Sequence, residues 1–226
     1  MLHSTSYFPP PESADSEGFL LFGGELTPDW ILDAYRNGIF PWPVFDDVEL
    51  MAWWSPDPRA IVELDGLHVS RRLVRTLRSG RFDVTVNQDF SGVVRACASV
   101  GDRARATWLT PEMIDAYEGL RRDGYAQSVE VWQDGQLAGG TYGVAIGAFF
   151  SAESMFYRVR DASKVALVHL VRRLQLRGFE LLDIQQLTDH TAAMGAREVG
   201  RDEYLSRLNR ALERNVSFVA GLECQV

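Results

Sequence analysis

Glu153 lies inside an apolar and aromatic run, FFSAESMF, at residues 149–156. The run has the composition of a buried strand. A buried carboxylate is costly unless it is paired or hydrogen-bonded. Two partners are open for Glu153: an arginine such as Arg158 or Arg160 in a structural salt bridge, or the ammonium group of a ligand.

A second set of polar side chains occurs in FELLDIQ, at residues 179–185. Alternate residues of a strand share one face, so Phe179, Leu181, Asp183 and Gln185 are expected on the same side. That side changes from apolar to polar along the strand. The change indicates either a sheet that leaves its core to line a cleft or a strand end that emerges into solvent.

Other catalytic schemes lack the spacing that they need. The sequence has no GxSxG elbow and no HExxH helix. His190 stands apart from other catalytic residue types and is interpreted as a structural hydrogen-bond partner, with a general base as the alternative. The two cysteines, Cys97 and Cys224, predict neither a disulfide framework nor a metal site. We therefore expect no metal and no cofactor.

A basic helix is predicted over residues 67–81, LHVSRRLVRTLRSGR. Its apolar residues recur on one side, and no acidic residue lies among its arginines. This face is either solvated surface or a phosphate-binding patch. The arginines on or beside it are Arg71, Arg72, Arg75, Arg78 and Arg81.

Four prolines and three tryptophans fall within residues 41–58, which excludes a regular helix or a central strand there. The segment predicts a stiff loop at the boundary of a small N-terminal domain. Trp42, Trp53 and Trp54 either pack in a core or form an aromatic wall for a ligand.

The composition predicts a globular protein, with 226 residues of which 46% are hydrophobic. A net charge of −8 disfavours diffuse attraction to nucleic acid or anionic lipid, so any nucleic-acid contact needs a local basic patch. The sequence contains neither a signal-peptide pattern nor an apolar run of membrane-spanning length. A cytoplasmic protein without membrane contact is expected.

The predicted elements give an α+β fold with a mostly antiparallel sheet. Residues 1–18 predict a mobile arm, residues 19–60 a small N-terminal domain and residues 61–226 a larger domain. Thr27-Pro28 predicts a helix start, as does Thr110-Pro111. Residues 128–156 predict a meander with a hairpin at Asp134-Gly135, followed by a helix from Ala162 to about Leu176.

Eight motifs, in this order and at these intervals, resemble the leucyl/phenylalanyl-tRNA–protein transferase family over about residues 21–208. They are FGGELTPDWILDAYRNGIFPW, WWSPDPRA, TWLTPEM, SVEVW, AESMF, ASKVAL, LLDIQ and DHTAAMGA. The resemblance implies that the larger domain is similar to the GNAT acetyltransferase fold. It implies transfer of Leu or Phe, and less well Met, from aminoacyl-tRNA to proteins that begin with Arg or Lys, which marks them for degradation. A monomer is expected.

The resemblance also implies the roles of individual residues. Asp183 and Gln185 would be the catalytic pair, and Arg71, Arg72, Arg75 and Arg78 would contact tRNA phosphates. Three pocket positions depart from familiar family members, which have Met at Thr141 and Phe at Leu170 and Leu174. The expected substrate-binding residues are Trp42, Trp108, Thr141, Glu153, Leu170, Leu174 and Leu182.

The implied chemistry needs no covalent intermediate, because an aminoacyl ester is already activated. We expect Asp183 to hold Gln185 and to stabilise the cationic amine, while Gln185 orients the reacting groups. A relay in which Asp183 takes the proton through Gln185 is the alternative. Glu153 would receive the ammonium group of the tRNA-borne amino acid or fix its pocket by hydrogen bonding.

Two rival functions share the predicted fold. The first is an acyl-CoA-dependent N-acetyltransferase, although the segment YRVRDASK lacks the glycine expected in a loop that binds the CoA pyrophosphate. The second is a non-catalytic module that binds tRNA or peptide.

Overall fold

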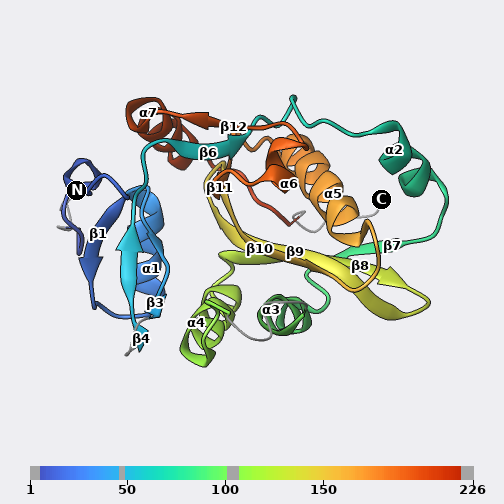
Figure 1. Cartoon of the computed structure of the whole chain (residues 1–226), viewed down its shortest axis with the longest axis horizontal. Helices are drawn as coiled ribbons and strands as arrows, with labels where there is room; N and C mark the ends of the chain where they lie inside the picture. Colours follow the sequence, from blue (N-terminus) through green and yellow to red (C-terminus); the bar gives the residue numbers. More distant parts are fainter. Residues whose placement is uncertain (1–5, 46–48, 101–106, 220–226) are drawn as a thin grey trace.

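The computed structural model describes residues 6–45, 49–100 and 107–219. Two sheets and their helices make up most of it (Figure 1). Cys224 and the first five residues of the predicted arm lie outside the described residues. None of the described helices combines the length and apolar character needed to cross a bilayer.

The N-terminal part has a three-stranded sheet in the order β1-β5-β2. Helix α1 begins as predicted, with Pro28 at its first position and the Thr27 side chain accepting from the Trp30 backbone N–H. Within the predicted arm, Phe8 is buried and its ring packs edge-on against Trp30 and Trp53. The elements are η1 (Pro11–Ser13), β1 (Phe19–Phe22), α1 (Pro28–Arg36), β2 (Phe40–Pro41), β3 (Val44–Phe45), β4 (Glu49–Leu50) and β5 (Ala52–Trp54).

The larger part is built on a seven-stranded sheet in the order β12-β6-β11-β10-β9-β8-β7. Among the described strands of this sheet, β10 and β11 pair in parallel and the other pairs are antiparallel. The predicted α+β class with a mostly antiparallel sheet is therefore confirmed. The strands are β6 (Arg59–Val62), β7 (Asp83–Val86), β8 (Ala126–Gln133), β9 (Gln136–Ile146), β10 (Phe149–Tyr157), β11 (Leu181–Gln185) and β12 (Ala196–Val199).

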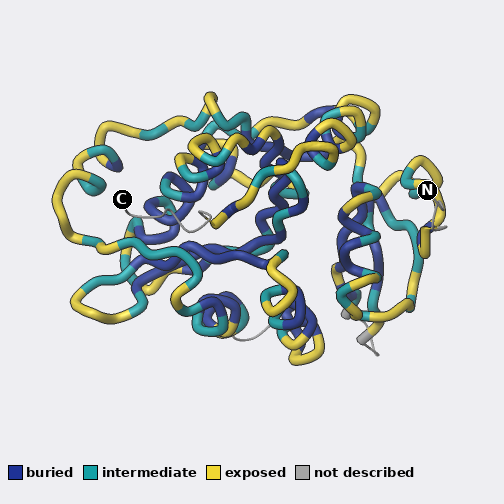
Figure 2. Tube along the Cα trace, turned by 180° about the vertical axis from the view of Figure 1, so that it is seen from behind, coloured by how far each residue is buried: buried dark blue, intermediate teal, exposed yellow. Residues whose placement is uncertain are grey.

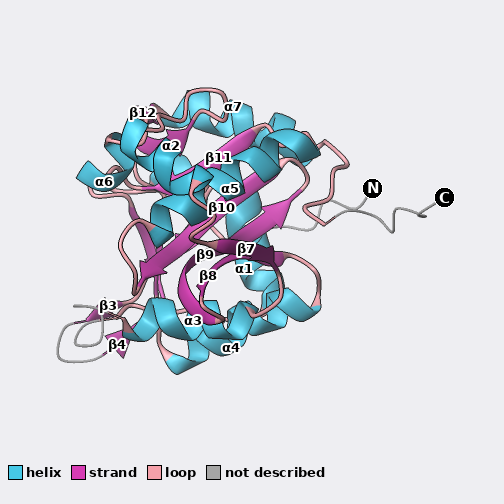
Figure 3. Cartoon of the chain, turned by 90° about the vertical axis from the view of Figure 1, so that its right-hand side faces the viewer, coloured by secondary structure: helices cyan, strands magenta, loops and turns pink. Residues whose placement is uncertain are grey.

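Helices cover both faces of this sheet. Helices α3 and α4 lie on one face, and α2, α5 and α6 lie on the other (Figures 1 and 3). Burial is concentrated along the central strands and the helix faces that meet them (Figure 2). The helices are α2 (Arg71–Arg78), α3 (Phe90–Ser99), α4 (Pro111–Arg122), α5 (Ala162–Arg177), α6 (Asp189–Ala192) and α7 (Arg201–Leu212).

Local signals predicted several boundaries correctly. Thr110 caps α4, α5 ends at Gly178 with a left-handed cap, and the β8–β9 hairpin turns at Asp134 and Gly135, both with positive φ. This backbone suits the short turn that the dipeptide predicts.

Two predictions about local structure were wrong. The basic helix predicted over residues 67–81 is shorter, because the Ser70 side chain caps α2 and the helix ends at Arg78. Phe179 precedes β11 and packs with Phe150 and Phe218, whereas Leu181 joins the opposite core. Strand alternation therefore does not extend back to Phe179.

Candidate functional site

A fork between two neighbouring strands positions the site. Strands β10 and β11 pair from Phe149 with Leu181 to Ser151 with Asp183, and their pairing then stops. The pairing of β10 with β9 is irregular between Ala152 and Ser154, and the pairing of β11 with β6 is irregular near Gln185, whose φ is 60°. Such bulges bend strands and redirect side chains. The two strands therefore open a gap next to their last paired residues.

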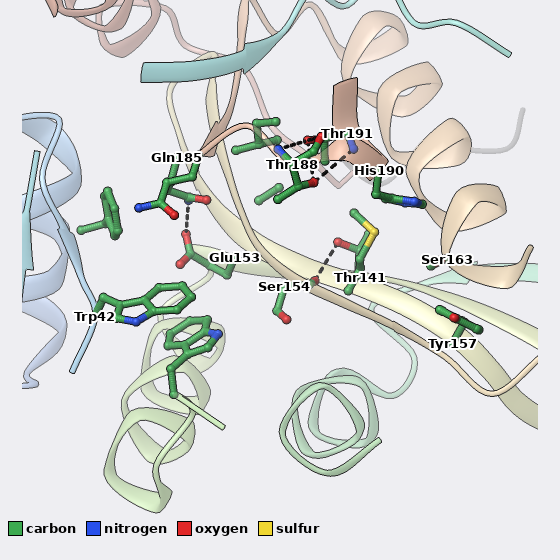
Figure 4. A pocket seen from close by; sticks show the side chains of 16 residues that line it. Trp42, Thr141, Glu153, Ser154, Tyr157, Ser163, Gln185, Thr188, His190 and Thr191 are labelled. Atoms are coloured by element: carbon green, nitrogen blue, oxygen red, sulfur yellow. Dashed lines mark hydrogen bonds between the residues drawn. The ribbon is translucent and has the colours of Figure 1, made fainter. Parts of the chain in front are cut away.

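A cavity of about 340 Å³ occupies this gap. Its walls come from the N-terminal part, the two forked strands and the start of α5 and α6 (Figure 4). The lining combines aromatic and aliphatic surface with a few polar groups, as small-molecule sites do. The lining residues are Phe40, Trp42, Trp108, Thr141, Ala152, Glu153, Ser154, Met155, Tyr157, Ser163, Ile184, Gln185, Gln186, Thr188, His190 and Thr191.

Glu153 lines the cavity at the base of the fork and bonds to hydroxyl and amide donors. Ser151 Oγ donates to Oε1 at 2.7 Å, and Tyr117 OH donates to Oε2 at 2.9 Å. Gln185 Nε2 lies 3.4 Å from Oε1 (Figure 4). The structural salt bridge considered from the sequence was wrong: Arg158 instead donates to the Leu137 carbonyl oxygen, and among the described residues no arginine pairs with Glu153.

Burial raises the pKa of Glu153 to about 7, and the nearby charge of Asp183 raises it further. Hydrogen bonds from Ser151, Tyr35 and Tyr117 act in the opposite direction but do not outweigh burial. Tyr117 OH also lies 2.9 Å from Tyr35 OH in the interior. Glu153 therefore changes its charge near neutral pH.

Asp183 lies behind the cavity wall and is fully buried. Its Oδ1 accepts from Arg59 Nε at 3.0 Å and from the Gln185 backbone N–H at 2.8 Å. Its Oδ2 accepts from Arg59 Nη2 at 2.7 Å and from Tyr204 OH at 2.8 Å. The carboxylate is thus held by four donors and is not part of the cavity lining.

Arg59 is buried in the same interior. Burial alone would lower the pKa of Arg59, but the Asp183 carboxylate outweighs it and raises the pKa. The rings of Phe40 and Tyr204 each lie 4.7 Å from the guanidinium carbon, and Nη1 donates to the Gly38 carbonyl oxygen at 2.9 Å. The guanidinium is therefore fully surrounded by partners.

Gln185 faces the cavity with its amide group. Its Nε2 donates to Ser151 Oγ at 2.7 Å and points toward Glu153 (Figure 4). Its backbone N–H is held by Asp183, which supports the left-handed conformation that a non-glycine residue rarely adopts. The predicted pair thus meets through the backbone of Gln185.

Trp42 and Trp108 form an aromatic wall at the cavity, with ring centroids 4.8 Å apart and planes 17° from parallel. Trp42 is 42% exposed, and its carbonyl oxygen accepts from Trp54 Nε1 at 2.9 Å. Trp53 is fully buried in the core of the N-terminal part. Trp42 therefore belongs to the aromatic wall of the cavity, whereas Trp53 packs in a core.

The other predicted pocket residues divide into two groups. Thr141 lines the cavity, and its Oγ1 donates to the Ser154 carbonyl oxygen at 2.9 Å. Leu170, Leu174 and Leu182 do not line it, because they are buried in the core between α5 and the sheet. They belong to that core and do not form the cavity surface.

Several residues around the site were not singled out from the sequence. Tyr35, Tyr117, Arg59 and Tyr204 come from four separate elements, and only their buried hydrogen bonds identify them. His190, interpreted as structural, lines the cavity, and its Nε2 has no hydrogen-bond partner among the described residues. Burial lowers the pKa of His190, and the charge of Lys164 adds to this effect.

The α2 arginines lie outside the cavity. Arg71, Arg75 and Arg78 are exposed, and Arg72 Nη2 forms an ion pair with Asp161 at 2.7 Å. Asp161 is the N-cap residue of α5, whose second residue, Ser163, lines the cavity. The ion pair therefore places Arg72 beside the start of α5, close to the part of the cavity that Ser163 lines.

Comparisons with known proteins agree on one family. The family model described as "Leucyl/phenylalanyl-tRNA protein transferase" matches residues 61–209, and the model of its N-terminal domain matches residues 24–57. A relative from Solidesulfovibrio magneticus named leucyl/phenylalanyl-tRNA–protein transferase is 51% identical over 207 residues, covering 91% of this chain and 83% of the relative. A relative of the same name from Nitrosospira multiformis is 47% identical and covers 92% and 89%.

Solved structures that align with the chain include N-acetyltransferases. A GCN5-related N-acetyltransferase from Kribbella flavida is 13% identical, with a TM-score of 0.41, and covers 75% of this chain and 60% of that one. A ribosomal-protein-alanine N-acetyltransferase from Brucella melitensis is 16% identical, with a TM-score of 0.36, and covers 48% and 81%. At these sequence identities and TM-scores, the structural similarity supports no conclusion about the activity of this chain.

Proposed function

Since this chain belongs to the leucyl/phenylalanyl-tRNA–protein transferase family, we propose that the cavity between β10 and β11 is where it transfers an amino acid from tRNA to the N-terminus of a protein. The chain is an aminoacyltransferase. The observation that carries the assignment of the site is the meeting of Trp42, Trp108, Glu153 and Gln185 in one cavity. They come from four elements or connections and converge only there.

The aminoacyl group of the donor would occupy the cavity with its side chain on apolar surface. Trp42 and Trp108 provide the aromatic wall, while Met155 and Ile184 add aliphatic surface. Burial of a leucine, phenylalanine or methionine side chain against such a surface is favourable, because it removes apolar area from water. The Glu153 carboxylate lies beside this surface in the cavity lining.

The reaction requires positioning more than activation, because the aminoacyl ester already reacts with amines. An α-amino group has a reference pKa of about 7.7–8.0, so a fraction is neutral at pH 7. Gln185 would orient the ester or the amine with its side-chain amide. Asp183 would act as a positioning residue, because it holds the Gln185 backbone from behind the wall.

The macromolecular partners follow from charge and from the family. Arg71, Arg72, Arg75 and Arg78 would contact phosphates near the acceptor end of the tRNA, giving affinity with little sequence readout. Acceptor proteins would begin with Arg or Lys, and the added residue would mark them for degradation. The enzyme would act as a cytoplasmic monomer.

A matrix of donors and acceptors tests this function. Purified protein is given leucylated, phenylalanylated or methionylated tRNA together with peptides that begin with Lys, Arg or Asp. We expect transfer to Lys and Arg peptides and none to the Asp peptide or to a Lys peptide with an acetylated N-terminus. Transfer of acetyl from acetyl-CoA, with no transfer from any charged tRNA, would contradict the proposal.

A further inference from the structure

The four donors around Asp183 leave it no acceptor position for a catalytic proton. An ionised carboxylate has about four lone-pair positions. Arg59 supplies two donors, and Tyr204 and the Gln185 backbone N–H supply the others. The side-chain amide of Gln185 is directed to Ser151 and Glu153 instead of to Asp183. A proton relay from Gln185 to Asp183 therefore has no path through these contacts.

Glu153 differs from Asp183 because it lines the cavity and, among the described residues, forms no ion pair. It lines the cavity, and Arg59 and the α2 arginines pair with other groups or lie outside the cavity. Its Oε1 faces two donors, Ser151 Oγ and Gln185 Nε2. Tyr117 OH donates to its Oε2, and Tyr35 is a further hydrogen-bond partner, so the described donors of Glu153 are all uncharged.

We propose that Glu153 is the proton acceptor for the attacking α-amino group and that Asp183 serves only to position Gln185. This inference rests on the proposed transferase function. The amine nitrogen forms a bond to the ester carbonyl carbon and passes one proton to the Glu153 carboxylate. The bond from that carbon to the ribose oxygen then breaks, and the oxygen leaves with its electron pair and takes the proton from Glu153.

The surroundings of Glu153 support this assignment. A pKa of about 7 lies close to that of an α-amino group, which is the range in which a general base is effective. Burial raises the pKa values of Tyr35, Tyr117 and Tyr204, so these phenols stay neutral. The groups that face Glu153 or its hydrogen-bond partners are Tyr35, Tyr117, Tyr142, Arg59, Asp183 and Tyr204.

Two positively charged or titrating groups on other elements also lie near the cavity. Burial lowers the pKa of His190 of α6, and the charge of Lys164 of α5 lowers it further. His190 lines the cavity but makes no hydrogen bond to Glu153. A pH profile must therefore include a His190→Gln variant, so that its titration is separated from that of Glu153.

The test compares two donors in pre-steady-state transfer to a Lys peptide. The first is leucyl-tRNA, and the second is 4-methylpentanoyl-tRNA, whose acyl group is leucine without its amino group. Glu153→Gln should lower kcat about 100-fold or more with both donors, the lower end of what general-base catalysis contributes. Its KM for either donor should stay within about threefold. Protonation of the attacking amine, with a reference pKa of about 7.7–8.0, lowers the rate of every variant as pH falls. A further fall as pH drops through about 7 should occur in wild type and in His190→Gln and be absent from Glu153→Gln.

Two further variants keep the test interpretable. Glu153→Asp retains a carboxylate and should keep the pH dependence at a lower rate. Asp183→Asn should lower the melting temperature and the rate. It should keep the pH dependence with its midpoint moved to lower pH, because the charge of Asp183 raises the pKa of Glu153. Thermal unfolding of Glu153→Gln checks that the protein is folded during the assay.

The results that would overturn the role of Glu153 differ from those that would contradict the proposed transferase function. If wild type transfers leucine but Glu153→Gln raises only KM, and only with leucyl-tRNA, Glu153 binds the donor ammonium group and the inference is wrong. If Asp183→Asn abolishes the pH dependence while the protein remains folded, Asp183 takes part in proton transfer and the inference is also wrong. Absence of transfer by wild type would instead contradict the function itself.

Discussion

Arg59 and Asp183, which are 124 residues apart in the sequence, form a two-pronged ion pair in the interior, with N–O distances of 3.0 and 2.7 Å. The pair joins β6 to β11 and has almost no solvent exposure. Each buried charge is stabilised by its partner, so removal of one partner leaves the other as an uncompensated charge in the interior.

Removing only the Arg59 cation should therefore lower the free energy of unfolding more than removing both charges of the pair. Arg59→Met should lower the free energy of unfolding by about 3–5 kcal/mol, whereas Arg59→Met with Asp183→Leu should recover much of that loss. Urea unfolding measures both. Both variants should lose transferase activity, because the Asp183 carboxylate that holds the Gln185 backbone N–H is left unpaired in the first and removed in the second. The control is Arg197→Met, since Arg197 forms exposed ion pairs that contribute less than about 1 kcal/mol. Equal losses in the single and double variants would contradict the coupling.

The aromatic wall should affect binding more than stability. Trp42 is 42% exposed, so Trp42→Ala should raise KM for leucyl-tRNA roughly tenfold, from the ~1–3 kcal/mol typical of aromatic stacking in nucleic-acid sites, and leave the melting temperature nearly unchanged. Trp53→Ala is the contrasting variant. It empties a buried position and should cost about 3–5 kcal/mol of unfolding free energy. An unchanged KM in Trp42→Ala would remove Trp42 from the donor site.

The basic patch predicts a specific dependence on salt. Replacing Arg71, Arg75 and Arg78 with Gln should weaken binding of leucyl-tRNA and reduce the slope of log affinity against log salt by roughly 0.7–0.9 for each tRNA phosphate that is no longer neutralised. Arg72 is kept because it pairs with Asp161. A variant with three other exposed arginines replaced has the same change in net charge: Arg36, Arg122 and Arg210. Equal slopes in the two variants would identify the patch as solvated surface.

The raised pKa of Glu153 predicts how stability changes with pH. The folded protein keeps the Glu153 proton up to about pH 7, while the unfolded chain loses it near the ordinary value of 4.5. The folded state binds more protons in this range, so the contribution of Glu153 to stability falls as pH rises from about 4.5 through about 7. Relative to wild type, Glu153→Gln should be similar near pH 4 and more stable near pH 8, by at most about 3 kcal/mol.

Urea unfolding at several pH values measures this difference. Tyr117→Phe provides a check, because it removes a hydroxyl that lowers the Glu153 pKa. The pH range in which stability falls should then move upward. A stability difference that does not vary between pH 4 and pH 8 would contradict the raised pKa.

The sequence predicted features that depend on neighbouring residues. Thr27-Pro28 and Asp134-Gly135 act within one turn, so the start of α1 and the β8–β9 hairpin were predicted correctly. Glu153 was identified because a carboxylate conflicts with its apolar neighbours. Its actual partners include Tyr117, 36 residues away, and no local pattern pairs these two positions.

The separation of β10 and β11 was also not predicted from the sequence pattern. Alternation in FELLDIQ placed Asp183 and Gln185 on one side, but the irregular pairing near Gln185 directs its amide to the cavity while Asp183 stays in the core. Edge strands β7 and β12 and helix α3 were not predicted either. Their positions depend on pairing and packing with distant segments.

The contact of Arg59 with the Gly38 carbonyl oxygen has a consequence for selectivity. Gly38 precedes the segment of Phe40 and Trp42, so one planar cation anchors both that segment and the strand that ends in Gln185. If the smaller sheet tilted, the Phe40–Trp42 segment and the strand that ends in Gln185 would then move together. Discrimination between a branched aliphatic and an aromatic amino acid should accordingly depend on side-chain volume at positions such as Thr141 and Met155, with the separation of the walls held constant.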